Sequence, residues 1–75
     1  MEATEFNNLN YQHQDELIFT HAIKVGSINT EWEEIDLYRF EGLLVEHRFI
    51  KDHEHNDFHA LESEKEVEPY KFLLN

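Results

Sequence analysis

Hydrophobic and polar positions alternate in three segments in the middle of the chain, with the two-residue period of a β-strand. Residues 17–25 (LIFTHAIKV) are rich in β-branched and aromatic side chains. Residues 31–40 (EWEEIDLYRF) and 43–50 (LLVEHRFI) repeat this composition. The segment GSINT between the first two has the composition of a turn. The pattern therefore predicts a small antiparallel sheet over residues 17–50.

The two ends of the chain have weaker patterns. Residues 1–16 are polar and rich in Asn and Gln, and we expect them to form a partly ordered lead-in. Residues 51–75 form an acidic C-terminal segment that begins with loop composition, KDHEHND. No internal repeat and no domain linker interrupts the chain, so residues 1–75 are expected to form a single domain.

One short helix is predicted within the C-terminal segment. It covers residues 57–67, with Asn56 or Asp57 as its N-cap, and Pro69 ends it. The following YKFLL is expected to be a last short strand. The predicted class is α+β, mainly β: a small curved antiparallel sheet with at most one short helix.

The stretch DLYRFEGLLVEHRF predicts a hairpin with a defined register. If Glu41-Gly42 is a two-residue loop, Phe40 pairs with Leu43, and counting back places Asp36 opposite His47. One face of this hairpin then carries Trp32, Glu34, Asp36, Tyr38, Phe40, Leu43, Val45, His47 and Phe49. This face is largely aromatic, with a carboxylate directly opposite an imidazole.

An Asp–His pair beside aromatic side chains is a candidate acid–base site. Cross-strand partners lie about 4.5–5.5 Å apart at Cβ, so Asp36 could orient the His47 ring and leave its other nitrogen for a substrate. The alternative is a polar cross-strand pair at the edge of the sheet, with no catalytic role. His21, between Phe19 and Ile23, has the surroundings of a core histidine.

The hairpin resembles the sheet signature of the SnoaL-like family, in the nuclear-transport-factor-2-like superfamily. The resemblance covers roughly residues 15–52, and DELIFTH looks like the family strand that ends in a histidine, here His21. The matched hairpin positions are Asp36, Arg39, Phe40, Glu41, Gly42, Val45, Glu46 and His47. The turn is one residue shorter than in the family, Arg48-Phe49 replaces Trp-Asp, and the family's N-terminal helices have no counterpart.

This resemblance implies a shortened SnoaL-like cone fold, consisting of the C-terminal sheet half alone. For the site it implies His47 as a general base and Asp36 as the residue that orients it. The pocket-lining residues it implies are His21, Phe19, Trp32, Tyr38 and Phe49. Family members include polyketide cyclases, isomerases and aldol-type enzymes, which need no cofactor, and a fold transfers architecture more safely than a reaction.

Composition narrows the possible partners. The net charge of −11, from 17 acidic and 6 basic residues, argues against binding nucleic acid, which requires a basic patch. The same charge suits solubility, or an acidic protein that binds a basic macromolecule. The absence of cysteine excludes disulfides, a thiol nucleophile and a thiolate zinc site. Without a signal-peptide pattern or an apolar run of about 18 residues, a cytoplasmic location is expected and membrane binding is not.

Three histidines, His53, His55 and His59, lie close together in DHEHNDFH. Imidazole can bind zinc, nickel or copper. This spacing matches no established ligand motif and is also typical of a solvated loop. No metal site and no cofactor are therefore predicted.

Three functions follow from these observations. The favoured one is a shortened SnoaL-like domain that self-associates through its sheet and keeps at most a vestigial pocket for a small hydrophobic ligand. The second is an active cyclase, isomerase or lyase, which the missing helices disfavour because a half-open pocket does not exclude water. The third is the acidic binding protein. A homodimer or higher oligomer is expected because the polar lead-in cannot cover the aromatic face.

Overall fold

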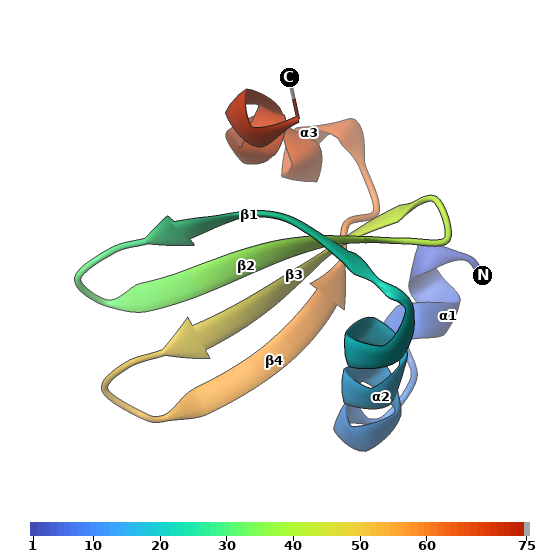
Figure 1. Cartoon of the computed structure of the whole chain (residues 1–75), viewed down its shortest axis with the longest axis horizontal. Helices are drawn as coiled ribbons and strands as arrows, with labels where there is room; N and C mark the ends of the chain where they lie inside the picture. Colours follow the sequence, from blue (N-terminus) through green and yellow to red (C-terminus); the bar gives the residue numbers. More distant parts are fainter. Residues whose placement is uncertain (75) are drawn as a thin grey trace.

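The computed structural model describes residues 1–74, and its helices and strands are nearly balanced (Figure 1). The elements are α1 (Ala3–Asn7), α2 (Tyr11–His21), β1 (Ile23–Asn29), β2 (Glu33–Phe40), β3 (Leu43–Ile50), β4 (His55–Ala60), α3 (Glu64–Val67) and the 3₁₀ helix η1 (Glu68–Leu73). The predicted α+β class with a small curved antiparallel sheet is confirmed. About 39% of the chain is strand and 35% helix, so the expectation of at most one short helix was too low.

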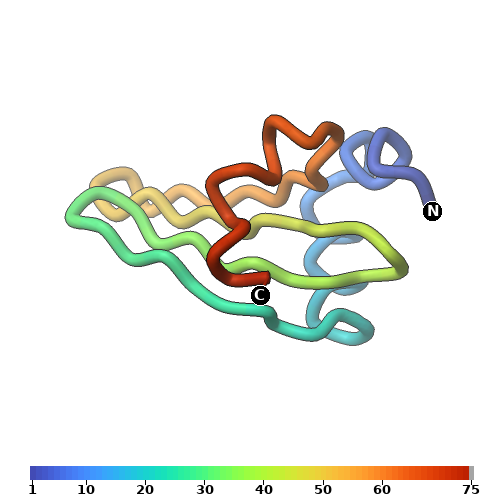
Figure 2. The backbone as a smooth tube through the Cα atoms, turned by 90° about the horizontal axis from the view of Figure 1, so that it is seen from above, coloured from blue at the N-terminus to red at the C-terminus, as the bar shows by residue number. Residues whose placement is uncertain are grey.

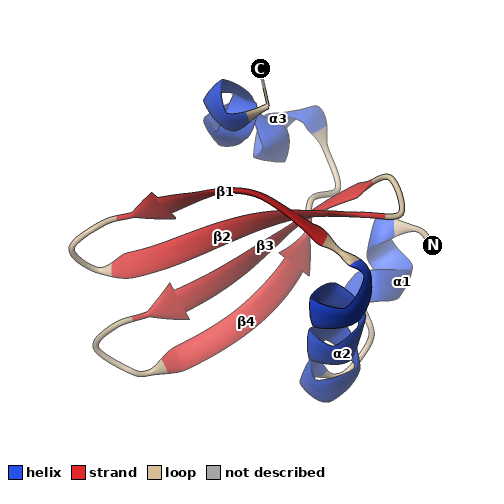
Figure 3. Cartoon of the chain, viewed as in Figure 1, coloured by secondary structure: helices blue, strands red, loops and turns tan. Residues whose placement is uncertain are grey.

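The four strands form an antiparallel meander in the order β1-β2-β3-β4 (Figure 3). The predicted hairpin register is confirmed, with Phe40 paired with Leu43 and Asp36 paired with His47. Glu41 (φ 47°) and Gly42 (φ 80°) both adopt left-handed backbone conformations. This is the geometry of a type I′ turn, whose twist matches that of the flanking strands.

The N-terminal residues form two helices rather than a partly ordered lead-in. In α1, the Glu5 carboxylate accepts a hydrogen bond of 3.0 Å from the backbone N–H of Glu2. In α2, Asn10 is the N-cap, and its side chain accepts a 2.8 Å bond from the backbone N–H of His13. These two helices cover the aromatic face of the sheet. The prediction had left that face without a cover.

The predicted strand over residues 17–25 is wrong for its first half, which belongs to α2. The helix buries Gln14 and Ile18, four residues apart on one face. Gln14 is a polar residue at a core position, where its Nε2 donates a 2.9 Å bond to the Phe6 carbonyl. A polar residue at this position concealed the helical period, and the sheet starts at Ile23 instead of Leu17.

The predicted turn GSINT is also wrong, because its first residues continue β1. The pairing of β1 with β2 shifts between Lys24 and Gly26, which marks a β-bulge at Val25. The chain turns later, where the Thr30 hydroxyl accepts hydrogen bonds from the backbone N–H groups of Trp32 and Glu33.

The C-terminal segment departs most from prediction. Residues 55–60 form β4, which extends the sheet to residue 60 and pairs His47 with Phe58. The helix begins only after Ser63, whose hydroxyl accepts from the Glu66 N–H, so neither Asn56 nor Asp57 is its cap. The YKFLL segment lies in η1 and its C-cap Leu74, not in a strand. Residues 55–60 form a strand because they pair with β3. This pairing depends on residues outside the C-terminal segment.

The helices from the two ends of the chain cover opposite faces of the sheet (Figures 1 and 2). We call the face against α1 and α2 the N-terminal face, and the one against α3 and η1 the C-terminal face. The N-terminal face buries a core of Phe6, Ile18, Tyr38, Phe40, Val45, Phe58 and Ala60. The C-terminal face buries a second core of Ile35, Leu37, Leu61 and Tyr70. None of the helices described over residues 1–74 is long and apolar enough to cross a membrane.

Candidate ligand-binding site

Asp36 and His47 lie on the same face of the sheet, opposite each other in register, as predicted. The expected hydrogen bond between them is absent from the described residues. The Asp36 carboxylate accepts a 2.8 Å hydrogen bond from Ser27 Oγ and lies 3.3 Å from Lys24 Nζ, both on β1. Within residues 1–74 no hydrogen bond joins Asp36 to His47. Asp36 is therefore engaged by the neighbouring strand.

His47 lies among aromatic rings. Its ring stacks on Phe58 with 4.4 Å between centroids and an interplanar angle of 14°. Phe19 from α2 meets it edge-on at 6.0 Å. The buried Nε2 atom of His47 has no hydrogen-bond partner in the described part of the chain. Aromatic contacts therefore position the His47 ring.

Of the other predicted pocket residues, Phe19 and Tyr38 meet beside His47, with 5.8 Å between their ring centroids. Tyr38 is buried in the core under α2, and Phe49 is half-buried. Phe19 is 59% exposed and Trp32 is 64% exposed. His21 is the last residue of α2 and is also exposed.

A pocket of about 330 Å³ lies on the opposite side, between the C-terminal face and the C-terminal helices. Its apolar lining comes from Ile28, Ile35, Leu61 and Pro69. Its polar lining comes from Glu46, Arg48, Glu66 and Tyr70. Mostly apolar walls with a few convergent polar groups are typical of a small-molecule site, and the volume is near the lower end of the usual range.

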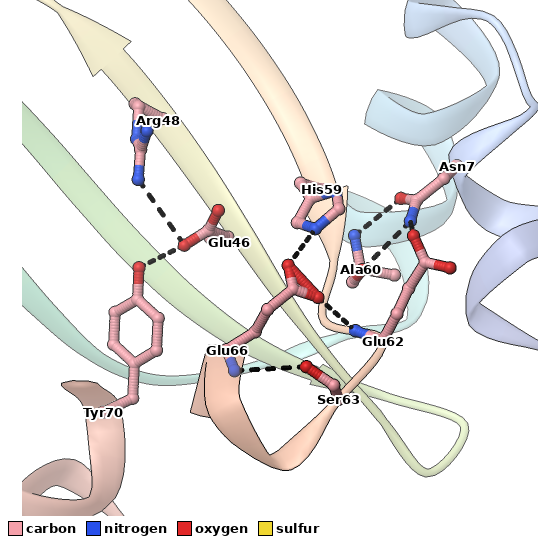
Figure 4. Close-up of polar contacts among 9 residues, drawn as sticks. All are labelled: Asn7, Glu46, Arg48, His59, Ala60, Glu62, Ser63, Glu66 and Tyr70. Carbon is pink, nitrogen blue, oxygen red and sulfur yellow. Dashed lines mark hydrogen bonds and ion pairs between the residues drawn. The ribbon is translucent and has the colours of Figure 1, made fainter. Parts of the chain in front are cut away.

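Glu46, Arg48 and Tyr70 form the polar side of this pocket (Figure 4). Glu46 and Arg48 are two residues apart on β3, so both point to the C-terminal face. The Tyr70 hydroxyl of η1 donates to Glu46 Oε2, and Arg48 Nη2 lies 3.7 Å from the same oxygen. Arg48 Nε forms an ion pair of 3.5 Å with Glu33 Oε2. This buried nitrogen has no hydrogen-bond partner among the described residues.

Glu66 of α3, a helix beside the pocket, contacts both β4 and the segment that follows it. His59 Nε2 of β4 lies 2.8 Å from Glu66 Oε2. The other carboxylate oxygen of Glu66 accepts a 2.7 Å bond from the backbone N–H of Glu62. Both oxygens of Glu66 are therefore used to hold α3 against the sheet, as Figure 4 shows.

Three groups with shifted pKa values line the pocket. Burial and then the hydrogen bond to Glu46 raise the pKa of the Tyr70 hydroxyl well above its usual value. Burial opposes the charge of Arg48, but Glu46 and Glu33 outweigh it and raise the pKa of the guanidinium. The Glu62 N–H and then His59 lower the pKa of the Glu66 carboxyl. Shifted titration in a pocket indicates a functional site, although structural networks also produce it.

The three clustered histidines are not brought together. His53 lies in the β3–β4 turn, and His55 lies 3.4 Å from Asp57. His59 contacts Glu66. In residues 1–74 no group of three His, Asp or Glu side chains is arranged to hold a metal ion.

Sequence reasoning missed this pocket because half of its lining comes from a segment that was misassigned. Leu61, Glu66, Pro69 and Tyr70 lie at or after the end of β4, whereas a helix was predicted across residue 60. One signal was available: Glu46 and Arg48 are charged residues at positions of β3 whose neighbours on the same face are Leu44 and Ile50. Charged groups on an otherwise apolar face indicate a buried polar network.

The fold and the pocket define a small α+β domain with helices on both faces of an antiparallel meander. Compared with models of known families, with curated proteins and with solved structures, the chain gives no match. The SnoaL-like resemblance therefore stays a prediction based on the hairpin residues.

Proposed function

We propose that this protein is a binding domain, not an enzyme, and that it takes a small, partly apolar molecule into the pocket beneath α3 and η1. The observation that carries this proposal is Arg48. Its guanidinium lines an apolar-walled pocket of about 330 Å³, and its buried Nε atom makes no hydrogen bond to a described residue. A buried N–H donor without a hydrogen-bond partner costs about 1–3 kcal/mol, and Nε is one such donor. A ligand with an acceptor group would remove this cost.

The arrangement at Asp36 and His47 gives less support to the cyclase or isomerase alternative. A general base needs a free nitrogen within hydrogen-bond reach of its substrate, and Nε2 of His47 is buried. The carboxylate that would orient the ring is held by Ser27 and Lys24. A binding role uses the pocket without requiring proton transfer from either residue.

The test is a screen of small organic molecules against the isotope-labelled protein by two-dimensional NMR. A binder should shift the backbone amide signals of Leu61, Tyr70 and the β3 residues around Glu46 and Arg48. A matched pair of variants locates the site: Arg48→Gln should weaken binding at least tenfold, and Arg39→Gln, an exposed arginine on the same face, should not. Binders that shift only signals near Phe19 and Trp32 would contradict the proposal.

A further inference from the structure

We infer that the ligand of this pocket is a zwitterion with a short apolar body, of the class of aliphatic α-amino acids. Its carboxylate would bind Arg48 and its ammonium would bind Glu46, while the apolar part would lie against Leu61 and Pro69. This inference rests on the proposed function, because it names the ligand class for the same pocket.

The carboxylate end is matched to Arg48. The two carboxylates near this guanidinium lie at 3.5 Å (Glu33) and 3.7 Å (Glu46), beyond the usual 2.7–2.9 Å of a charge-assisted hydrogen bond. They compensate its charge, while its buried Nε atom keeps no hydrogen-bond partner among the described residues. The planar guanidinium fits a carboxylate through two parallel hydrogen bonds.

The ammonium end is matched to Glu46. Tyr70 and Arg48 both contact the same oxygen, Oε2, and the other oxygen of Glu46 makes no hydrogen bond to a described residue. The Glu46 side chain is only 13% exposed, so this oxygen faces the pocket from a largely buried side chain. The charged ends of Glu46 and Arg48 lie side by side, as do the ammonium and carboxylate of an α-amino acid, which are attached to one carbon.

Charge balance favours a zwitterion over an ion of one sign. The lining holds one cation, Arg48, and two carboxylates, Glu46 and Glu66, in a chain of net charge −11. A simple carboxylate would add a further negative charge beside Glu46, and a simple amine would lie beside Arg48. Repulsion between like charges therefore disfavours binding of the simple carboxylate and of the simple amine. A zwitterion presents each end to its opposite charge.

The apolar walls of the pocket determine the size and chemical character of the apolar part of the ligand. Ile28, Ile35, Leu61 and Pro69 are aliphatic, and the volume corresponds to about eleven waters at roughly 30 Å³ each. An aliphatic side chain of four or five carbons suits this space better than a long chain or a fused ring system.

The test compares four probes that share one branched aliphatic body on the unmodified protein. They are leucine, 4-methylpentanoate (no ammonium), 3-methylbutylamine (no carboxylate) and the neutral 4-methylpentan-1-ol. Binding is measured by calorimetry and by the amide shifts of the pocket residues. We expect leucine to bind at least tenfold more tightly than each of the other three.

Two variant pairs assign the two ends. Arg48→Gln should bring leucine down to the affinity of the amine, and Glu46→Gln should bring it down to that of the acid. Arg39→Gln and Glu41→Gln, at exposed positions near the hairpin turn, should leave the affinity unchanged. Because the probe series uses the unmodified protein, it decides the question even if a pocket variant does not fold.

The outcomes separate the two proposals. If the acid, the amine or the alcohol binds in the pocket as tightly as leucine, the zwitterion inference is wrong and the proposed function stands. If none of the four probes shifts a pocket signal, the zwitterion inference is wrong, and the screen of other molecules decides the proposed function.

Discussion

At the scale of single residues, His47 combines a well-packed ring with a buried nitrogen that makes no hydrogen bond. Phe58 stacks on it and Phe19 meets it edge-on, contacts that a phenylalanine ring makes equally well. Its buried Nε2 has no partner among residues 1–74, and such an atom costs about 1–3 kcal/mol. We therefore expect His47→Phe to raise the free energy of unfolding by about 1 kcal/mol. Urea denaturation measures this, with the exposed His21→Phe as control. A clear loss of stability would indicate that Nε2 makes a contact of its own.

Tyr70 gives η1 a polar contact with the sheet, because its hydroxyl donates to Glu46. Removing this hydroxyl leaves a carboxylate that is only 13% exposed without one of its donors. We expect Tyr70→Phe to lower the free energy of unfolding by about 2 kcal/mol, since hydrogen bonds to charged groups contribute about 1.5–3 kcal/mol. Tyr11→Phe, at an exposed ring, is the matched control. Equal stability of the two variants would contradict the anchoring role.

The same residue gives a pH dependence. Burial and the Glu46 hydrogen bond raise the pKa of Tyr70 above its unfolded value of about 10. A raised pKa stabilises the fold at pH values below about 10, and this contribution is lost as the pH rises towards the folded value. Between pH 10 and 11.5, stability should fall more steeply in the natural protein than in Tyr70→Phe. Tyr11 and Tyr38, whose pKa values are also raised, are present in both proteins and cancel in the comparison.

At the scale of elements, one side chain joins α1 to the outer edge of β4. Asn7 Oδ1 accepts a 2.7 Å bond from the Ala60 N–H, and Asn7 Nδ2 donates a 3.0 Å bond to the Ala60 carbonyl. This amide therefore makes the two hydrogen bonds that a further strand would offer at that residue. We expect Asn7→Ala to lower the free energy of unfolding by about 1–2 kcal/mol and to speed hydrogen exchange at Ala60. Asn8→Ala, at an exposed neighbouring position, should do neither.

The elements also show why sequence reasoning succeeded for the hairpin and failed at both ends. In the β2–β3 hairpin, the turn residues and the alternation are local, so Glu41-Gly42 alone determined the register. The helix α2 depends on Gln14, whose buried amide is satisfied only by the Phe6 carbonyl of another helix. The strand β4 depends on pairing with β3 and on Asn7, which is 53 residues away from Ala60. Such contacts leave no periodic signal in the segment itself. For the same reason, Tyr70 could not be assigned to the neighbourhood of Glu46.

At the scale of the whole molecule, the reason for expecting self-association has changed. The aromatic face was expected to need a second copy, but α1 and α2 cover Tyr38, Phe40 and Val45 within one chain. Val45 is fully buried there, so its side chain is not available to a second copy. The oligomeric state stays a prediction, which light scattering measures directly.

The charge of the whole molecule gives a prediction that does not depend on any one contact. With a net charge of −11, repulsion among acidic groups opposes the compact state, and salt screens it over about 10 Å at 0.1 M. We expect the melting temperature to rise by several degrees between 10 mM and 0.5 M sodium chloride. Sucrose at matched osmolarity separates screening from general exclusion effects. A melting temperature that falls with salt would show that the ion pairs of the sheet outweigh the repulsion.

The placement of the C-terminal helices on one face has a consequence for how such a domain can diversify. Leu61, Glu66, Pro69 and Tyr70 form half of the pocket, and none of them belongs to a strand or to the core under α1 and α2. Leu61 and Tyr70 also belong to the core of the C-terminal face, whereas Glu66 and Pro69 do not. Substitutions at these two positions can therefore alter the shape and selectivity of the pocket while both cores keep their residues, which offers a route to new specificities on one meander.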